Sequence, residues 1–139
     1  MKKILILGAG IYQVPLIKKA KEMGLYTIVA SIPGNYPGFA YADKVIYEDT
    51  VAADAILKIA QEEKVDGICT SGTDVAVITI GKVCDAMELR GVSAHGAEIA
   101  CDKSLMKKAF EENDVQTAQG RYVPLSASRE EIEDICKEL

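Results

Sequence analysis

The stretch KILILGAGIYQ, residues 3–13, decides the fold of this chain. Its apolar run, residues 4–7, consists of four branched residues, which is typical of a strand buried on both faces of a parallel sheet. Gly8 and Gly10 follow at once, and glycines let the backbone turn sharply and approach a ligand closely. A helical pattern comes next, so the amides that open this helix point towards any group above the strand. The stretch therefore predicts a ligand-facing loop at the carboxyl end of a first strand.

Length and composition limit the function classes that fit this chain. Its 139 residues suffice for one domain, or for one domain and the start of another. Hydrophobic residues make up 49% of the sequence, yet no apolar stretch is long enough to span a bilayer. The run 4–7 is also too short for a signal-peptide core and has no cleavage region after it. We therefore expect a cytoplasmic protein with no membrane partner.

Charge and cysteine usage argue against two kinds of site. The net charge is −5, and the lysines at 18, 19, 21, 107 and 108 share helical patterns with acidic residues. Nucleic acid is not expected as a partner, because binding its backbone needs concentrated positive charge. The four cysteines, at 69, 84, 101 and 136, show no C-x-x-C spacing, which favours reduced thiols over a disulfide or a metal site.

Strand and helix patterns alternate through residues 1–96. Apolar and β-branched runs predict strands at 4–7, 26–31, 44–47 and 66–70, and helical spacing predicts intervening helices at 14–23 and 51–63. We expect Thr50 to cap the second helix, and Thr73 or Asp74 to cap a third helix after the fourth strand. Short links and right-handed crossovers predict a doubly wound α/β parallel sheet with strand order 3-2-1-4.

This strand order places a crevice between the first and fourth strands. The chain reverses direction there, and ligands of such sheets bind at this switch point. Residues 8–13 and 70–74 end on the two lips of the crevice, because the strands run parallel. The loop 32–43 leaves the same sheet edge with two Pro-Gly pairs and aromatic residues at 36, 39 and 41. These aromatic side chains fit either of two roles, packing against the domain or contact with a substrate.

From residue 97 the pattern changes, and we divide the chain there. Residues 1–96 form the predicted α/β domain, and residues 97–139 form linker helices and the start of a second domain. Before this boundary, 91–94 is expected to be a brief extended piece, and His95 fits a turn better than a catalytic role.

The second part is expected to be mainly helical. Asp102 caps a predicted helix, and residues 120–123 read as a short strand. Residues 128–131 form a capping box for a last helix that runs to Leu139. Because this helix has no stop signal, we expect a chain cut at a domain boundary.

The glycine loop raises the alternative of a Rossmann-type module that binds or senses NAD(P). Its fingerprint requires three glycines as G-x-G-x-x-G, and Gln13 stands in place of the third. It also requires an acidic residue at the end of the second strand, where this chain has Ser31-Ile32-Pro33. The strand followed by two glycines fits the fingerprint, but the third glycine and the acidic residue are missing, so this is the weaker hypothesis. A protein-interaction module that uses the helix ending at Leu139 is a further alternative.

Four segments together suggest a family. They are GAGIYQ at 8–13, AD at 42–43, SGTDVAV at 71–77, and CDKSLMKKAF at 101–110, which VQTA follows at 115–118. In this order they resemble the N-terminal portion of ATP-grasp ligases, such as carbamoyl-phosphate synthetase large subunit, biotin carboxylase and the ATPase subunit of phosphoribosylaminoimidazole carboxylase. The resemblance covers essentially the whole chain. It implies a pre-ATP-grasp, biotin-carboxylase-like domain followed by a helical linker.

The resemblance also implies roles for particular residues. Lys103, from the Asp-Lys pair, is expected to reach the phosphates of ATP as a point charge. The glycine loop of such enzymes faces the acceptor substrate, a small carboxylate or amine. This implies substrate binding by Gly8, Gly10, Tyr12, Gln13, Thr73 and Asp74. No residue of this chain is assigned a catalytic or metal-binding role.

By the same resemblance, the complete enzyme would use ATP and magnesium to activate a carboxylate as an acyl phosphate, which an amine or a thiol then displaces. The family's nucleotide-clamping strands, second phosphate-binding lysine and magnesium ligands lie beyond the segments matched here. We therefore expect the 139-residue chain alone to be inactive. A homodimer is compatible with the sequence.

Overall fold

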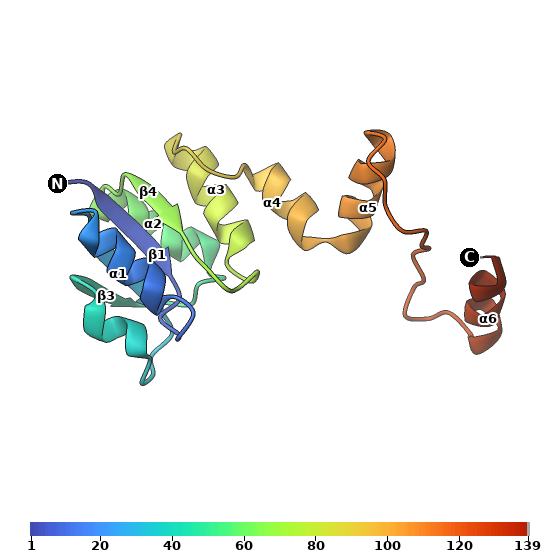
Figure 1. Cartoon of the computed structure of the whole chain (residues 1–139), viewed down its shortest axis with the longest axis horizontal. Coiled ribbons are helices and arrows are strands. Elements are labelled where there is room, and N and C mark those ends of the chain that lie inside the picture. The colour runs from blue at the N-terminus through green and yellow to red at the C-terminus, as the bar shows by residue number, and fades with distance from the viewer. Residues whose placement is uncertain (139) are drawn as a thin grey trace. The chain divides into compact units, whose positions relative to one another are not determined.

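The computed structural model describes residues 1–138 and contains a four-stranded parallel sheet in the order β3-β2-β1-β4 (Figure 1). The strands are β1 Lys3–Leu7, β2 Tyr26–Ser31, β3 Lys44–Tyr47 and β4 Gly67–Cys69. The helices are α1 Val14–Glu22, α2 Ala53–Glu63, α3 Val77–Met87, α4 Ala94–Cys101, α5 Lys103–Glu112 and α6 Arg129–Glu138, with a short 3-10 helix, η1, at Pro37–Tyr41. The predicted doubly wound α/β fold and its strand order are confirmed.

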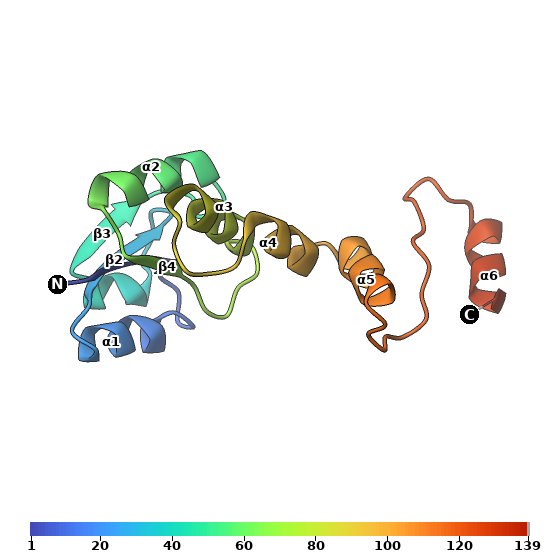
Figure 2. The same cartoon turned by 90° about the horizontal axis from the view of Figure 1, so that it is seen from above.

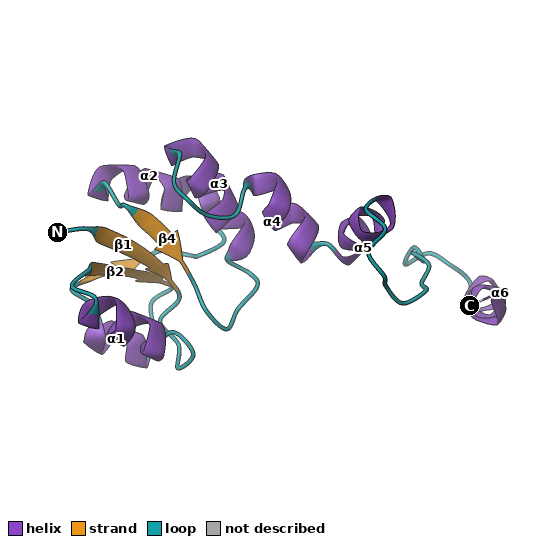
Figure 3. Cartoon of the chain, turned by 45° about the horizontal axis from the view of Figure 1, so that its top comes forward, coloured by secondary structure: helices purple, strands orange, loops and turns teal. Residues whose placement is uncertain are grey.

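Alternate residues of the central strands enter two separate cores, one on each face of the sheet. The first core joins the strands to α2 and α3 and includes Leu5, Leu7, Ile28, Ala30, Ile56 and Val83. The second joins them to α1 and includes Ile6, Val29, Ile17 and Ala20. Figure 2 and Figure 3 show α1 on one side of the sheet and α2 and α3 on the other. Burial on both faces explains why the strands read as unbroken apolar runs.

The start of α2 differs from the prediction. Thr50 was expected to cap it, but the helix begins at Ala53, and its N-cap, Ala52, makes no side-chain capping bond. A turn precedes the helix instead: the Val51 amide donates to Asp49 Oδ1 at 3.1 Å, and the Ala52 amide donates to the Asp49 carbonyl at 3.0 Å. Asp49 therefore satisfies the amides of Val51 and Ala52 in this turn, and the helix starts after it.

The expected capping of α3 by Thr73 or Asp74 is also wrong. This helix begins at Val77, and its N-cap, Ala76, makes no side-chain capping bond. A turn precedes it, in which the Val77 amide donates to the Asp74 carbonyl at 3.1 Å. Asp74 thus supplies a backbone oxygen rather than its carboxylate.

No strand forms at residues 91–93, and Ala94, the last residue of the expected extended piece, is already helical. Helix α4 begins at Ala94, whose amide donates to Asp85 Oδ2 at 2.9 Å. It packs closely on α3, because a Cβ at Gly81 would lie only 2.8 Å from the Ala97 Cβ. His95 therefore lies in a helix, and not in a turn as expected, with its side chain exposed.

By their contacts, the described residues form one compact unit up to Cys101 and a second from Asp102 onward. Helix α4 crosses residue 96, where the sequence suggested a boundary, and the division at 96/97 stays a prediction. None of the helices described has the combined length and apolar character needed to cross a membrane.

In the second unit, both predicted helix caps are confirmed. Asp102 accepts hydrogen bonds from the Ser104 and Leu105 amides at 2.8 and 3.1 Å. In the capping box, Glu131 accepts from the Ser128 amide at 2.7 Å and its own amide donates to Ser128 Oγ at 3.2 Å. The expected strand at 120–123 does not form, and the described residues of this unit contain no other strand with which it could pair. Leu139, the expected end of the last helix, lies outside the described residues.

Asp43 fastens the start of β3 to β2, which gives the Ala-Asp pair at 42–43 a structural role. Its Oδ2 accepts hydrogen bonds from the Thr27 amide and hydroxyl, both at 2.9 Å, and its Oδ1 pairs with Lys21 Nζ at 2.5 Å. These bonds, led by the one from Lys21, lower the pKa of Asp43 to about 2. The folded state therefore favours the ionised carboxylate.

We predict that Asp43→Asn destabilises the chain by about 1 kcal/mol at neutral pH, since the ion pair is partly solvated and screened. The pKa of Asp43 is lower when folded, so its contribution is complete above the unfolded pKa of about 4. It is lost as the pH falls through the folded value of about 2. Urea unfolding at neutral and acidic pH measures the difference.

Glu98→Gln is the matched control, because Glu98 is exposed on α4 and makes no ion pair within residues 1–138. It removes the same charge but should leave stability nearly unchanged. A penalty for Asp43→Asn that stays constant down to about pH 2 would contradict the proposed linkage.

Candidate functional site

The glycine loop turns tightly at the carboxyl end of β1. Gly8 has a φ of +95°, a conformation that L side chains rarely adopt, and its amide donates to the Ala30 carbonyl at 2.8 Å. The Gln13 amide then donates to the Gly10 carbonyl at 3.1 Å, and Gln13 is the N-cap of α1. The loop thus forms as predicted, as a direct link from the central strand into a helix.

The Gln13 side chain lies over the two glycines. A Cβ added at Gly8 or at Gly10 would come within 3.1 Å of this side chain, which is only 5% exposed. Its Nε2 donates a hydrogen bond to the Ser71 carbonyl. The glycines therefore make room for a residue of the chain itself, in the place that a ligand phosphate occupies in dinucleotide-binding loops.

The two predicted lips are hydrogen-bonded to each other. Thr70 Oγ1 donates to the Leu7 carbonyl at 2.6 Å, and Ser71 Oγ donates to the Tyr12 carbonyl at 3.0 Å. With the bond from Gln13, these contacts join the loop 8–13 to the loop 70–76. The lips meet as expected, but the space between them is bridged rather than open.

Helix η1 supports the glycine loop from its other side. The Gly38 amide donates to the Ala9 carbonyl at 2.8 Å, and a Cβ at Gly38 would lie 2.7 Å from that oxygen. Phe39 packs into the core under α1 and meets the rings of Tyr36 and Tyr47 edge-on, with centroids 5.9 and 5.5 Å away. Packing therefore accounts for Phe39, whereas Tyr36 both packs and lines the adjacent pocket.

A pocket of about 280 Å³ opens at this sheet edge, and we call it the glycine-loop pocket. It is lined by Leu7, Gly8, Ala9, Gly10, Tyr12, Gln13, Ser31, Ile32, Tyr36, Asp49, Thr50, Gly72, Thr73 and Val75. Five of the six predicted substrate residues line it, and the sixth, Asp74, is exposed outside the lining. Whether any of them binds substrate stays a prediction.

Sequence reasoning missed the part of this pocket formed by the ends of β2 and β3. Ser31 is the last residue of β2, and Asp49 and Thr50 follow β3. A signal was present, because the carboxyl ends of parallel strands lie at one sheet edge. The switch point lies between β1 and β4, so the predicted site included the loop after β4 and left out the ends of β2 and β3.

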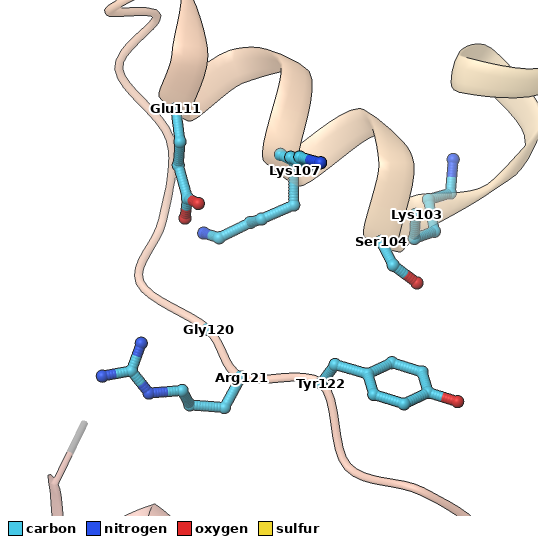
Figure 4. Close-up of a pocket in the computed structure, with 8 residues that line it drawn as sticks. Lys103, Ser104, Lys107, Glu111, Gly120, Arg121 and Tyr122 are labelled. Atoms are coloured by element: carbon cyan, nitrogen blue, oxygen red, sulfur yellow. The ribbon is translucent and has the colours of Figure 1, made fainter.

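The second unit contains a pocket of about 410 Å³ between α5 and the segment 120–122, here called the α5 pocket (Figure 4). It is lined by Lys103, Ser104, Lys107, Lys108, Glu111, Gly120, Arg121 and Tyr122. Figure 4 shows Lys107 extending towards Gly120, whereas the Lys103 ammonium points away from that segment. Four of the eight lining residues are basic, which suits an anionic group. Lys107 and Arg121 were not among the residues predicted to bind.

The described residues offer no metal centre, and two of the cysteines, Cys69 and Cys84, are not activated as nucleophiles. No group of three or more His, Cys, Asp or Glu side chains within residues 1–138 could hold a metal ion. Burial raises the pKa of the Cys69 thiol to about 11, and burial next to Asp85 raises the pKa of Cys84. Both thiols are therefore protonated at neutral pH and are poor nucleophiles.

No protein-family profile matches this chain, and no curated protein sequence matches it. Solved structures do, and they are ATP-grasp enzymes whose N-terminal domain has the fold of this chain. Phosphoribosylglycinamide synthetase from Anaerococcus prevotii superposes with a TM-score of 0.83 and 32% identity, over 99% of this chain and 35% of that one.

Two more distant structures share the fold. The biotin carboxylase domain of Hydrogenobacter thermophilus 2-oxoglutarate carboxylase, a dimer with MgADP and bicarbonate, gives a TM-score of 0.75 at 22% identity, covering 99% of this chain and 32% of that one. L-amino acid ligase from Bacillus licheniformis gives 0.67 at 16%, covering 99% and 41%. The chain thus spans between about a third and two fifths of these three proteins.

We predict that Gly38→Ala destabilises the chain by about 1–3 kcal/mol, because the new methyl group would collide with the Ala9 backbone and shift the glycine loop. Gly67→Ala is the control, since a Cβ there meets nothing within 4 Å. That change should alter stability by less than about 1 kcal/mol. Urea unfolding compares the two, and equal losses would show that the contact between η1 and the loop is unimportant.

Proposed function

We propose that this chain is the substrate-side N-terminal part of an ATP-dependent ligase that joins a carboxylate to an amine or a thiol. In this reaction class a carboxylate oxygen attacks the γ-phosphorus of ATP, and ADP leaves. The nucleophile then attacks the acyl carbon and phosphate leaves, as in carbamoyl-phosphate synthetase chemistry. The observation that supports the proposal most is the 32% identity to phosphoribosylglycinamide synthetase over 99% of this chain.

In this proposal the glycine-loop pocket holds the acceptor substrate. Gly8, Gly10, Tyr12, Gln13 and Thr73 line it, and the exposed Asp74 lies on the adjoining loop 70–76. The hydrogen bonds between the two loops fix these residues relative to one another, which is what substrate positioning requires. The chain itself supplies no nucleophile or general base to this proposal.

The nucleotide phosphates are assigned to the α5 pocket. Lys103 begins α5 directly after its cap, and Lys107 and Arg121 add positive charge within the same unit. These cations fit a polyphosphate. The described residues do not fit a magnesium ion, because they contain no suitable carboxylate cluster.

The alternative of a nicotinamide-binding module is weaker. The Gln13 side chain covers Gly8 and Gly10, and a neutral serine, Ser31, stands where the ribose-binding carboxylate belongs. The alternative of an interaction surface at Leu139 concerns a residue outside the described part of the chain. A cytoplasmic location, a small-molecule carboxylate or amine as partner, and a homodimer all belong to the proposal. The dimeric biotin carboxylase domain is compatible with the last of these.

The test of the proposed function uses the protein expressed from the intact gene. It should convert ATP to ADP only when a carboxylate and an amine or thiol are both present. With ¹⁸O-labelled carboxylate, one label should appear in the released phosphate. Lys103→Ala should raise the KM for ATP about tenfold, which is the change expected when one charge-assisted hydrogen bond is lost.

Lys137→Ala is the matched control, because Lys137 pairs with Asp134 on the exposed surface of α6. Its KM for ATP should equal that of the unaltered protein. Phosphate without label, or ADP formation that needs no carboxylate, would contradict the acyl-phosphate route.

For the 139-residue chain alone we predict no ATP hydrolysis and no ATP binding tighter than about 1 mM, since a few point charges on one pocket wall give little affinity. Titration calorimetry with ATP, with and without magnesium, measures this. An affinity equal to that of the intact gene product would show that this chain forms the whole nucleotide site.

A further inference from the structure

Ser31 contributes a hydroxyl group without a hydrogen-bond partner to the glycine-loop pocket. Ser31 is only 7% exposed, it lines the pocket, and its side chain makes no hydrogen bond within residues 1–138. Thr27, on the same strand, is fully buried, but its hydroxyl donates to Asp43. No buried side-chain oxygen among the described residues lacks a partner, so the unbonded Ser31 hydroxyl is accessible in the pocket and available to a ligand.

A carboxylate lines the same pocket as this hydroxyl. Ser31 pairs in register with Tyr47, and the Glu48 amide donates to the Ser31 carbonyl at 3.1 Å. Asp49 is the next residue along the chain and lines the same pocket. One of its oxygens, Oδ1, accepts from the Val51 amide at 3.1 Å, which leaves Oδ2 for a ligand.

The charge of the pocket favours a cation. Among the described residues that line it, Asp49 is the only charged one, and none is a lysine or an arginine. An anionic ligand would meet this carboxylate with no basic side chain beside it, whereas a cation would be attracted. The side chain of Gln13 also covers the glycines over which a phosphate would otherwise bind to the start of α1.

The size of the pocket favours a small ligand. Its volume of about 280 Å³ lies at or below the lower end of ordinary ligand pockets, about 300–1,000 Å³. Around the carboxylate, the hydroxyl groups of Ser31, Thr50 and Thr73 can donate and accept hydrogen bonds. These groups suit a compact amine with further polar atoms.

We infer that the glycine-loop pocket binds the primary ammonium group of a small amine, held by the Asp49 carboxylate and the Ser31 hydroxyl. The role of this amine as the acceptor of the ligation rests on the proposed function. The binding of the amine does not rest on the proposed function, since it is inferred from the charge, the lining residues and the size of the pocket.

The inference is tested by NMR titration of the ¹⁵N-labelled 139-residue chain with three compounds of similar size. β-Alaninamide has an ammonium group, propionamide lacks it, and succinamate has a carboxylate in its place. We expect β-alaninamide to shift the amides of Gly8, Ile32, Asp49 and Thr50, and to bind at least about tenfold more tightly than the other two. Inorganic phosphate should leave these amides unshifted.

Two variants identify the groups responsible. Asp49→Asn should weaken β-alaninamide binding about tenfold, and Ser31→Ala about threefold, as expected for a charged and a neutral hydrogen bond. Asp54→Asn is the control, because Asp54 is exposed in the first turn of α2 and does not line the pocket. It removes the same charge and should leave binding unchanged.

The inference is overturned if succinamate or phosphate shifts the pocket amides as strongly as β-alaninamide, or if none of the probes shifts them. The selectivity among probes is measured on the unaltered chain, so a variant that fails to fold does not remove the test. Ammonium binding in a gene product without ligase activity would refute only the proposed function. Ligase activity without ammonium binding in this pocket would refute only this inference.

Discussion

The structure of the candidate site depends on one buried side chain, that of Gln13. As the N-cap of α1 it lies over Gly8 and Gly10, and its amide nitrogen donates to the Ser71 carbonyl. This contact joins the loop after β1 to the loop after β4, although the two loops are far apart in the sequence. It also fills the space above the glycines, and the pocket beside it is lined by residues that follow β2, β3 and β4. A glycine at position 13 would leave that space to a ligand, as in dinucleotide-binding loops.

The sheet could be predicted because its determinants are local or topological. Branched apolar runs locate β1, β2 and β3 to within a residue, and a central strand buried on both faces needs no alternation. Right-handed crossovers then leave one strand order, β3-β2-β1-β4. The meeting of the loops 8–13 and 70–74 follows from the same topology. Five of the six residues to which the family resemblance assigned substrate binding lie on these loops and line the pocket.

The parts that could not be predicted depend on contacts between distant residues. Threonine is a common helix cap, so Thr73 was a reasonable candidate. In the structure, Thr70 and Ser71 instead hold the loop before α3 by donating hydrogen bonds to the Leu7 and Tyr12 carbonyls. The helix therefore starts later, at Val77. The run 120–123 has strand-like residues, yet a strand forms only against a partner, and the described residues of its own unit contain no other strand. The direction of the Gln13 side chain and the unpartnered Ser31 hydroxyl are likewise properties of the packed molecule.

The two pockets differ in charge, and this difference bears on their chemistry. The glycine-loop pocket has one carboxylate and no basic side chain, whereas half the residues lining the α5 pocket are basic. A single site for both an amine and a polyphosphate would need opposite charges in one place, where each ligand would meet a repulsive group. Two separate pockets of opposite charge avoid this conflict. The charge distribution of this chain therefore fits a ligase in which the amine is held by one structural unit and the nucleotide phosphates by another.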